Sequence, residues 1–338
     1  MTLQTKADRK NRKLTEEIFS DIIKAKKDGV PIFTGRVRYA IESEEKMSFV
    51  ISQKQYLASA ETKVQYEPFI FDDTGFEVRK IDVNFGHPLY ATVADIFHIR
   101  SVSSDVNILP VVPDGCMSMV FRNDNEKITG YICGVIDELR KVEIKPQQEY
   151  IFIRFVPGAG YTLVNEPANL TANKTISIRN KTHWGEQVLS ILERENDITE
   201  RVRLISKLIR VQMQSEPNKY LIKYCTERIF QSQGNIKVEK LAEETGFTSR
   251  YIGKMFDRCV GLSPKLFAQI IRMQASMNCI LEDKEKLLVE IAVDCGFFDH
   301  AHMNRTYRKF LGGCSSGEFR KSLLRNLDYD KIDDYISV

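Results

Sequence analysis

The sequence predicts an α+β protein, with a β-rich N-terminal domain built as a barrel or a sandwich, a helical connector and an all-α C-terminal domain. Three observations support this organisation. Short segments that alternate apolar and polar residues fill residues 31–180, strand-like patterns stop near Thr182, and one helical pattern occurs twice after residue 217. At 338 residues the chain is also too long for one ordinary hydrophobic core.

The composition is that of a soluble globular protein, with 43% apolar and 28% charged residues. No segment approaches the roughly 18 consecutive apolar residues that span a bilayer, and the basic N-terminus lacks the apolar core of a signal peptide. We therefore expect a cytoplasmic protein with no membrane segment. The seven cysteines lack C-x-x-C spacing, so they predict neither a disulfide framework nor a structural zinc site.

The first 180 residues divide into two parts. Residues 1–30 have the pattern of a polar helix that ends before Pro31. Residues 31–180 are expected to form the β-rich regulatory domain, with strands at Phe76–Val83, Ile108–Val112, Met117–Phe121, Val142–Ile144 and Tyr150–Phe155.

One turn in this domain carries a strong local signal. Asp114-Gly115 separates Ile108–Val112 from Cys116–Phe121, and Gly readily adopts a positive φ. We therefore expect these two segments to form a β-hairpin.

Residues 181–216 predict the helical connector, with helices over His183–Glu193 and Ile198–Gln214. Apolar residues recur in the second helix at steps of three and four, which places Ile198, Val202, Ile205 and Ile209 in one stripe. The stripe fits either a dimer seam or packing against the chain's own β-rich domain, and both readings stay open. The segment Ser215–Asn218 breaks the pattern and is expected to be a linker.

A repeated pattern dominates residues 217–327, which precede an acidic tail over 328–338. Each copy has an apolar residue followed by a small Ala, where two helices can cross closely, and a Gly four residues later that permits a tight turn. An apolar pair four residues apart then anchors a second helix by one face. The first copy consists of Leu241-Ala242…Gly246-Phe247 and the pair Ile252/Phe256. The second copy consists of Ile291-Ala292…Gly296-Phe297 and the pair Met303/Tyr307. The offset between the copies is 50 residues at the first motif and 51 at the apolar pair. This pattern predicts two helix-turn-helix units.

The opposite face of each second helix is suited to contacting bases. Arg and Lys pair with guanine, Asn with adenine, and small side chains with thymine methyl groups. A single basic face would fit plain solvation equally well, but two matched copies favour DNA. Residues Lys219 to Arg325 also contain 18 Lys and Arg against 12 Asp and Glu. The candidate DNA contacts are Arg250, Gly253, Lys254 and Arg258 in the first unit, and His300, Ala301, Asn304, Arg305 and Arg308 in the second.

The segment between the two units predicts a rigid spacer. Pro264 suits the first turn of a helix, and the helical pattern continues to Glu282. A helix of that length spans roughly 28 Å. Helices in successive major grooves on one face of DNA need a separation of about 34 Å, so the spacer suits joint binding by both units.

Residues 220–325 resemble the DNA-binding domain of the AraC/XylS family of transcriptional regulators. The resemblance rests on the repeated motifs, on Gly261-x-Ser263-Pro264 and on Tyr307-Arg-Lys-Phe-Leu-Gly312. It implies that bases are contacted by Arg250, Gly253 and Lys254, and by His300, Ala301, Asn304 and Arg305. Gly253 has no side chain to make its contact. The second copy departs from the family with Ser316 in place of a usual proline and with the doubled Gly312-Gly313.

Residues 85–180 resemble a β-rich N-terminal domain of some AraC-type regulators, through segments 113–121, 153–159 and 166–171. The resemblance implies that this domain senses an effector or mediates self-association. An effector pocket could be lined by Tyr131, Arg154, Phe155, Tyr161 and Trp184, although aromatic residues of this kind also form ordinary core.

Together these features predict a sequence-specific transcriptional regulator with no enzymatic activity and no cofactor. Its expected partners are double-stranded promoter DNA, a small-molecule effector, RNA polymerase and a second copy of the chain.

The sequence also has two rival interpretations. A metal-dependent enzyme needs converging ligands, but the N-terminal histidines His87, His98 and His183 are widely spaced. The His-x-His pair, His300 and His302, lies in the second recognition helix instead, with His302 expected to be scaffold or surface. The remaining alternative is a DNA-tethered enzyme or a cysteine-based redox or alkylation sensor, for which Cys116 and Cys133 in adjacent predicted strands are the candidate pair. Ordinary half-buried strand residues are the simpler explanation of these two cysteines.

Overall fold

The computed structural model describes residues 37–41, 47–51, 75–81, 83, 87, 89–90, 92–124, 127–164, 166–213 and 219–325. The chain divides into two compact units, Met1–Lys63 and Val64–Val338. In the first unit, β1 (Val37–Ile41) and β2 (Met47–Ile51) form an antiparallel pair. The expected helix over 1–30, the linker at Ser215–Asn218 and the acidic tail over 328–338 lie outside the described residues.

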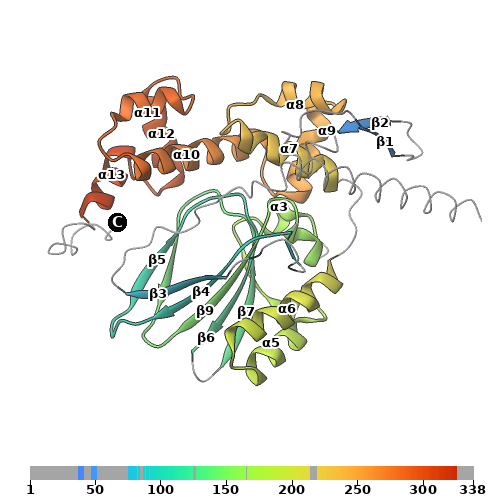
Figure 1. Ribbon diagram of the computed structural model, residues 1–338, viewed down its shortest axis with the longest axis vertical. Helices are drawn as coiled ribbons and strands as arrows, with labels where there is room; N and C mark the ends of the chain where they lie inside the picture. Colours follow the sequence, from blue (N-terminus) through green and yellow to red (C-terminus); the bar gives the residue numbers. More distant parts are fainter. Residues whose placement is uncertain are drawn as a thin grey trace, which may run out of the picture. The chain divides into compact units, whose positions relative to one another are not determined.

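The second unit begins with a six-stranded antiparallel sheet of order β10-β7-β6-β9-β4-β3 (Figure 1). A separate two-stranded sheet pairs β5 with β8. The strands are β3 (Phe76–Ile81), β4 (Val93–Ser101), β5 (Asn107–Val111), β6 (Ser118–Asn123), β7 (Ile128–Cys133), β8 (Arg140–Ile144), β9 (Glu149–Phe155) and β10 (Thr175–Ser177). The sheets do not close, so the barrel-or-sandwich expectation resolves to a sandwich-like arrangement.

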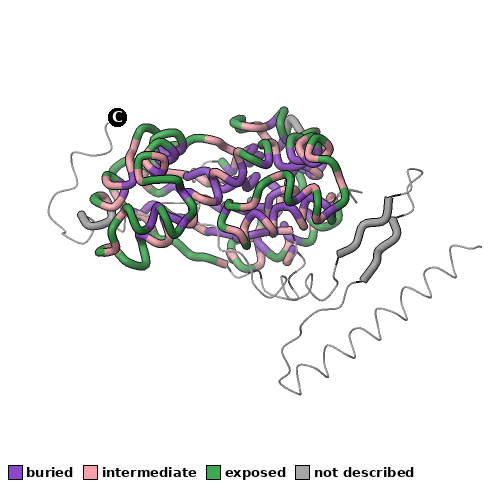
Figure 2. Tube along the Cα trace, turned by 90° about the horizontal axis from the view of Figure 1, so that it is seen from above, coloured by how far each residue is buried: buried purple, intermediate pink, exposed green. Residues whose placement is uncertain are grey.

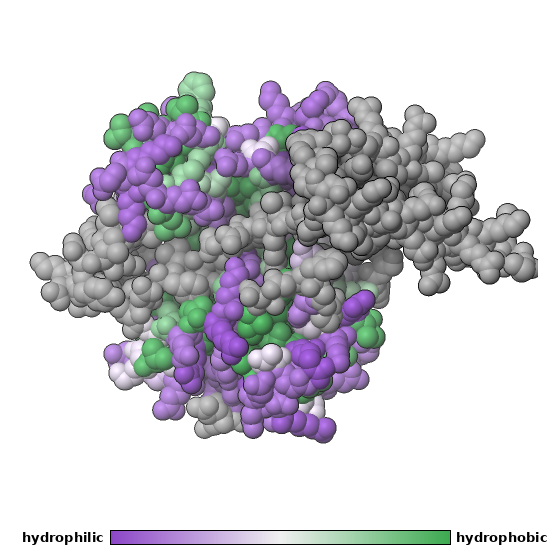
Figure 3. Space-filling model, in the orientation of Figure 1, coloured by the Kyte–Doolittle hydropathy of each residue, from purple (hydrophilic) through white to green (hydrophobic). Residues whose placement is uncertain are grey.

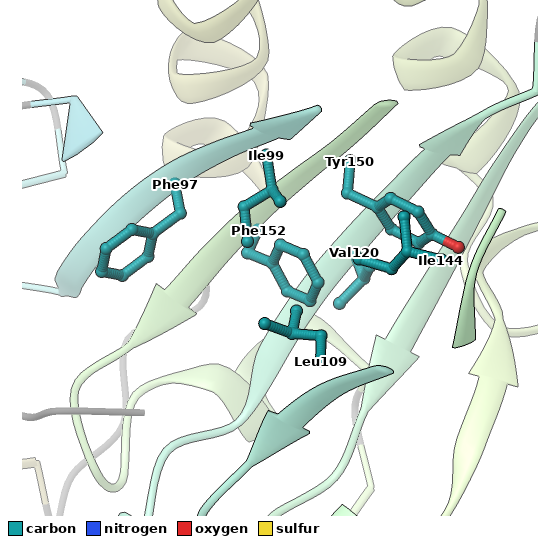
Figure 4. Close-up of a cluster of buried hydrophobic side chains, with 7 residues drawn as sticks. All are labelled: Phe97, Ile99, Leu109, Val120, Ile144, Tyr150 and Phe152. Carbon is teal, nitrogen blue, oxygen red and sulfur yellow. The ribbon is translucent and has the colours of Figure 1, made fainter. Parts of the chain in front are cut away.

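Apolar side chains from both sheets form one core (Figure 4). Alternate residues of a strand point to the same face, so Phe97 and Ile99 of β4 meet Phe152 of β9 on one side of the large sheet. Leu109 of β5 and Ile144 of β8 are fully buried against them. The small sheet therefore covers one face of the large one.

The expected hairpin around Asp114-Gly115 is wrong. β5 pairs with β8, while β6 pairs with β7 and β9, so the two segments flanking the turn are not partners. Gly115 does adopt the positive φ, at 78°, and the Asp114 carboxylate accepts a hydrogen bond from the Cys116 backbone N–H (2.7 Å). The local turn signal was real, but the turn carries the chain from one sheet to the other because Leu109 is buried in the second layer.

The connector helices α5 (Gly185–Arg194) and α6 (Ile198–Gln212) follow three short elements, α3 (Ala168–Thr171), β10 and α4 (Ile178–Lys181). α5 packs on β7 and on α6, so the connector belongs to the same packed unit as the sheet. Val202, Ile205 and Ile209 of the apolar stripe are at most 2% exposed in the single chain. The stripe is thus covered by the chain itself, as in the second of its two readings.

A polar cluster joins α6 to the sheet. Glu149 of β9 bonds His98 of β4 and Asn123 of β6, and Arg201 of α6 lies 3.5 Å from its second oxygen. The hydrogen bond from His98 and these other partners outweigh burial and lower the pKa of Glu149 to about 2. Because the folded state holds the charged form, Glu149 stabilises the fold above its unfolded pKa of about 4.3, and this contribution is lost as the pH falls towards 2.

The C-terminal region is all helical: α7 (Lys219–Gln231), α8 (Val238–Thr245), α9 (Ser249–Cys259), α10 (Pro264–Glu282), α11 (Leu288–Asp294), α12 (His300–Phe310) and α13 (Ser316–Arg325). The spacer helix α10 has the bounds expected from the sequence. It contacts α7 and α9 on one side and α11, α12 and α13 on the other. Figure 2 shows buried stretches running through the interior of the helical region, with exposed residues around them.

The Glu149 cluster gives a test of the connector's packing. E149Q is expected to lower the urea midpoint at pH 6, and its deficit relative to the unchanged protein should shrink as the pH falls from about 4.3 towards 2, since the unchanged protein then loses the same contribution. E77Q is the control, because the Glu77–Arg100 pair is more than half exposed and should matter little at any pH. A deficit that stays constant over this pH range would contradict the account.

Candidate nucleic-acid interface

The first helix-turn-helix unit consists of α8, a turn and α9. α8 ends at Gly246, whose φ of 74° is left-handed and closes the helix. Thr248 then caps α9 by accepting a hydrogen bond from the Tyr251 backbone N–H (3.2 Å). Leu241 of α8 and the anchoring pair Ile252 and Phe256 of α9 are fully buried, and the two helices are in contact. The residues that the sequence assigned to the scaffold therefore form it.

The second unit, α11 and α12, repeats this construction. Gly296 takes the turn position with φ 75°, and Asp299 caps α12 by accepting from the His302 backbone N–H (2.5 Å). Met303 and Tyr307 are fully buried. In the first unit the capping residue directly follows Phe247, whereas Phe298 separates Phe297 from its cap. This inserted residue explains why the repeat offset grows from 50 to 51, and its side chain is 89% exposed.

On α9, the three cations proposed from the sequence, Arg250, Lys254 and Arg258, are exposed. Gly253 is half-buried, and a Cβ built there would have no atom within 4 Å. The space at this position is therefore open, so the missing side chain reflects no steric demand of the fold.

On α12, the expected contact residues divide into two groups. Ala301, Arg305 and Arg308 are exposed, whereas His300 and Asn304 are half-buried. Among the described residues, no carboxylate lies within 4.0 Å of Arg305, Arg308 or the three cations of α9. These charges are therefore available to a polyanion.

His300 and Asn304 are held by the next helix. The Asn304 amide oxygen accepts hydrogen bonds from the backbone N–H (3.0 Å) and the hydroxyl (2.7 Å) of Ser316, and His300 Nε2 lies 3.2 Å from the same hydroxyl. Pairing with adenine uses both the oxygen and the NH₂ of an Asn side chain. Asn304 can read adenine in that manner only if its bonds to Ser316 break.

This contact also explains the departure at Ser316. Ser263 caps α10, and the following Pro264 has no N–H to satisfy. In the second copy, Ser315 and Glu318 form a reciprocal capping box at the start of α13. Ser316 then takes the place of the proline and brings an extra donor, for which Asn304 supplies the acceptor. α13 begins at Ser316.

The β-rich domain contacts both units, which the sequence did not indicate. At the end of α9, Asn169 Nδ2 donates to the Asp257 carboxylate (2.9 Å), and a Cβ at Gly261 would lie 2.8 Å from Val135. At the end of α12, the Leu139 backbone N–H donates to the Phe310 carbonyl (2.8 Å). Both contacts lie at the C-terminal ends of the recognition helices.

The spacer helix is held by the turn between the two sheets. Gln274 of α10 donates to the Pro113 carbonyl (2.8 Å), and this bond is buried. Phe267 packs so closely on Gly115 that a methyl group there would overlap its ring. We call these contacts, with those at Asp257, Gly261 and Phe310, the brace.

A buried ion cluster shapes the turn within the brace. Arg154 of β9 is 1% exposed and donates to Asp95 of β4 (3.0 Å) and to Asp114 of the turn. Burial opposes its charge, but Asp114 and Asp95 together raise the pKa of Arg154 above its ordinary value. Arg154 therefore links the large sheet to the turn that meets α10.

The other four residues proposed to line an effector pocket lie as follows. Phe155, Tyr161 and Trp184 are at most 5% exposed, and Tyr131 is half-buried. A depression between the large sheet and the connector involves different side chains: Phe121, Asn123, Ile128, Glu149, Ile151, Leu192 and Arg201.

Of the two cysteines of the rival reading, Cys116 is buried and Cys133 is half-buried. The Cys116 sulfur lies 3.8 Å from Arg154, and the Cys133 sulfur lies 3.8 Å from the Thr175 hydroxyl. Burial is the main cause that raises the pKa of both thiols. Since the thiolate is the reactive form, these environments suppress redox or alkylation chemistry.

The described residues contain neither a membrane-spanning helix nor a cluster of metal-ligating side chains. None of their helices is long and apolar enough to cross a membrane. No group of three or more His, Cys, Asp or Glu side chains among them could hold a metal ion. His302 packs edge-on against Phe297 and accepts from the Phe298 backbone N–H, so it serves the scaffold.

Two family models match the chain, one in the C-terminal helical region and one in the β-rich domain. Residues 241–322 match the model of a helix-turn-helix domain. The C-terminal region is an AraC-type helix-turn-helix domain. Domains of this kind bind DNA in transcriptional regulators. Residues 87–177 match a domain of unknown function, DUF6597, which covers strands β4 to β10 of the two sheets.

Solved structures similar to this chain include ToxT from Vibrio cholerae O395, with 9% sequence identity and a TM-score of 0.37 over 74% of this chain and 99% of that one. Another is ToxT bound to (E)-4-(8-methylnaphthalen-1-yl)but-3-enoic acid, with 12% identity and a TM-score of 0.36 over 76% and 100%. Curated protein sequences give no match. The assignment of the AraC-type domain rests on the family model.

The structural role of Asn304 is tested by a double-mutant cycle. N304A should destabilise the protein by about 1 kcal/mol, because the first turn of α13 loses an acceptor. In an S316P background, which lacks the donor, the same change should cost much less. Thermal or urea unfolding of the four proteins measures the difference, and equal costs in both backgrounds would contradict the role.

Proposed function

We propose that this chain is a sequence-specific transcriptional regulator that places α9 and α12 in two successive major grooves. The observation that carries the proposal is the duplication. Two recognition helices with exposed cations are joined by α10, a 19-residue helix packed against both units. The length of α10, roughly 28 Å, is similar to the separation of about 34 Å between successive major grooves.

The place of a residue along its recognition helix indicates whether it contacts bases or phosphates. Recognition helices usually contact bases with their N-terminal residues. Arg250 and Ala301 lie in the first turns of α9 and α12, and Lys254 and Arg305 lie at the centres of these helices. We assign all four residues to base edges. Arg258 and Arg308 lie nearer the C-terminal ends and fit phosphate contacts. His300 and Asn304 remain candidates that must first release Ser316.

The β-rich domain, residues 31–180 in our division, is proposed to control this arrangement through the brace. The brace holds the C-terminal ends of both recognition helices and leaves their N-terminal halves uncovered. We infer that the braced form is the one that binds DNA, because it fixes the units without occupying their reading faces. An effector acts by binding braced and unbraced forms with different affinity.

The other parts of the proposal follow from the family. We expect no enzymatic activity and a place of action in the cytoplasm, with promoter DNA and RNA polymerase as partners. A homodimer also remains part of the proposal. Burial of Val202, Ile205 and Ile209 inside the single chain argues that its contact lies away from this stripe.

The direct test is selection of DNA by the full chain. Fragments of its own genome are mixed with excess random duplex, and the protein should enrich particular sites with an affinity that falls steeply as salt rises. R305A and K254A should each cost about 1–3 kcal/mol and relax the preference at one position of the enriched site. Uniform weakening on all sequences would show that the two residues contact phosphate alone, and no enrichment would contradict the function.

The brace is tested by substituting two glycines that both have a positive φ, one inside the brace and one outside it. G115A adds a methyl group that overlaps Phe267 across the brace, while G313A adds one in open space; both glycines have positive φ, at 78° and 93°. Both changes strain the backbone, but G115A alone should weaken binding to the enriched site, by roughly tenfold or more. Fluorescence anisotropy well below both melting temperatures measures this. Equal affinity of the two variants would show that the brace does not support DNA binding.

A further inference from the structure

Two cysteine sulfurs meet between the spacer helix and the second helix-turn-helix unit. Cys279 lies in the last turn of α10, Cys295 directly follows α11, and their sulfurs are 3.7 Å apart. Cys279 is half-buried and Cys295 is buried. We call these two residues the thiol pair. A disulfide bond holds its sulfurs at about 2 Å, so the thiol pair could be joined by a small movement.

The first unit shows that the scaffold does not require these sulfurs. With the 50-residue offset between the copies, Cys279 and Cys295 correspond to Ile229 and Thr245, which are both buried. The Thr245 hydroxyl donates a hydrogen bond to the Leu241 carbonyl within α8 (2.7 Å). A unit of the same construction therefore folds with no sulfur at either position, and the thiol pair needs an explanation outside the folding of the unit.

The surface beside the thiol pair restricts which oxidant can reach it. Five carboxylates and two lysines lie between residues 282 and 294, and all five carboxylates are exposed. Figure 3 shows apolar side chains among polar ones at the upper left, where Figure 1 places α11; Val289 and Val293 are exposed there. A negative surface repels an anionic oxidant such as glutathione disulfide, but it does not repel a small neutral oxidant such as hydrogen peroxide.

We propose that hydrogen peroxide converts the thiol pair into a disulfide bond, and that this bond weakens DNA binding. The half-buried Cys279 sulfur attacks one peroxide oxygen, the O–O bond breaks, and water leaves behind a sulfenic acid. The Cys295 sulfur then attacks the sulfenic sulfur, and the hydroxyl leaves with the Cys295 proton as a second water. The two thiols lose two electrons and two protons in total, which reduce one peroxide to two waters.

The different burial of the two thiols fits this order of steps. Burial is the largest cause that raises the pKa of Cys295 to about 12, so Cys295 is a poor first nucleophile. Its sulfur nevertheless already lies against that of Cys279, where the sulfenic acid forms. By contrast, Cys116 and Cys133 lie beside Arg154 and the Thr175 hydroxyl, so neither has a thiol in contact to complete a disulfide.

The backbone beside Cys295 connects the thiol pair to the recognition helix. Asn235, from the loop between α7 and α8, donates to the Cys295 carbonyl (3.2 Å), and a methyl group at Gly296 would overlap Asn235. Because α10 is packed against both units, we expect the approach of the sulfurs to move the end of α11 instead of α10. That movement disturbs the Asn235 contact and the turn at Gly296, which leads into α12. This inference rests on the proposed function and adds a chemical signal that regulates it.

The first measurement locates the disulfide without any DNA. The full chain is reduced, treated with hydrogen peroxide and then with catalase, and its remaining thiols are alkylated before digestion. Mass spectrometry should find Cys279 linked to Cys295 and the other five cysteines alkylated. Seven alkylated cysteines, or a link that involves Cys314, would overturn the inference.

The second measurement is the affinity of both forms for the enriched DNA fragment. The oxidised protein should bind roughly tenfold more weakly, about the loss of one base contact, and dithiothreitol should restore the affinity. C279S and C295T, the latter with the residue of the first unit, should bind as the reduced protein does and should not respond to peroxide. C314S removes another half-buried cysteine of the C-terminal region and is the control, which should respond as the unchanged protein does.

The other outcomes separate the hypotheses. A disulfide with unchanged affinity would mean that rotation of the side chains alone forms it, and would overturn the regulatory role. A peroxide response that persists in C279S would place the oxidation elsewhere. A melting temperature that falls together with the affinity would mean that oxidation unfolds the unit, because a disulfide without strain stabilises the fold. Failure of the reduced protein to prefer any DNA site would instead reject the proposed function itself.

Discussion

The packing of α10 is the constraint on which the functional arrangement depends. Its buried side chains include Phe267, Ile271 and Met277, and it contacts helices of both helix-turn-helix units. A helix buried on several sides cannot bend or rotate without opening cavities in both units, which protein interiors resist. The separation and relative rotation of α9 and α12 are therefore properties of one helix and its packing.

In the proposed function, the β-rich domain acts on DNA binding through the same helix. Arg154 lies in the large sheet, its partner Asp114 lies in the turn between the sheets, and that turn meets α10 through Pro113 and Gly115. Removing one partner of such a buried ion pair leaves an uncompensated charge, typically at a cost of about 3–5 kcal/mol. A change in the sheet near Arg154 thus has a short physical route to the spacer between the recognition helices.

The helical half of the molecule could be predicted closely from the sequence. Local signals specify it: Ser263 and Pro264 fix the start of α10, glycines mark both turns, and the apolar pairs define the buried faces. The repeat supplied a second, independent copy of each signal. The repeat also showed that the offset changes by one residue, but it did not show that Phe298 is the inserted residue. That assignment requires knowing that Asp299 caps α12.

The β-rich half was predicted at the level of strands but not of their pairing. The hairpin expected at Asp114-Gly115 failed because partner choice depends on contacts distant in sequence, such as Arg154 with Asp114 and β5 with β8. The brace was invisible for the same reason. Asn304 shows the limit at the level of one residue: its type suggested adenine recognition, but Ser316 in the next helix uses its amide oxygen.

In the proposed function, α10 holds two recognition helices for successive major grooves on one face of DNA. The most direct measurement is the affinity of the full chain for its mapped site after five base pairs are inserted between the two contacted grooves. That insertion turns one groove to the opposite face of the duplex, so the account predicts a loss of at least about tenfold. Unchanged affinity would mean that the two units bind independently or that one of them does not bind, and would contradict the claim.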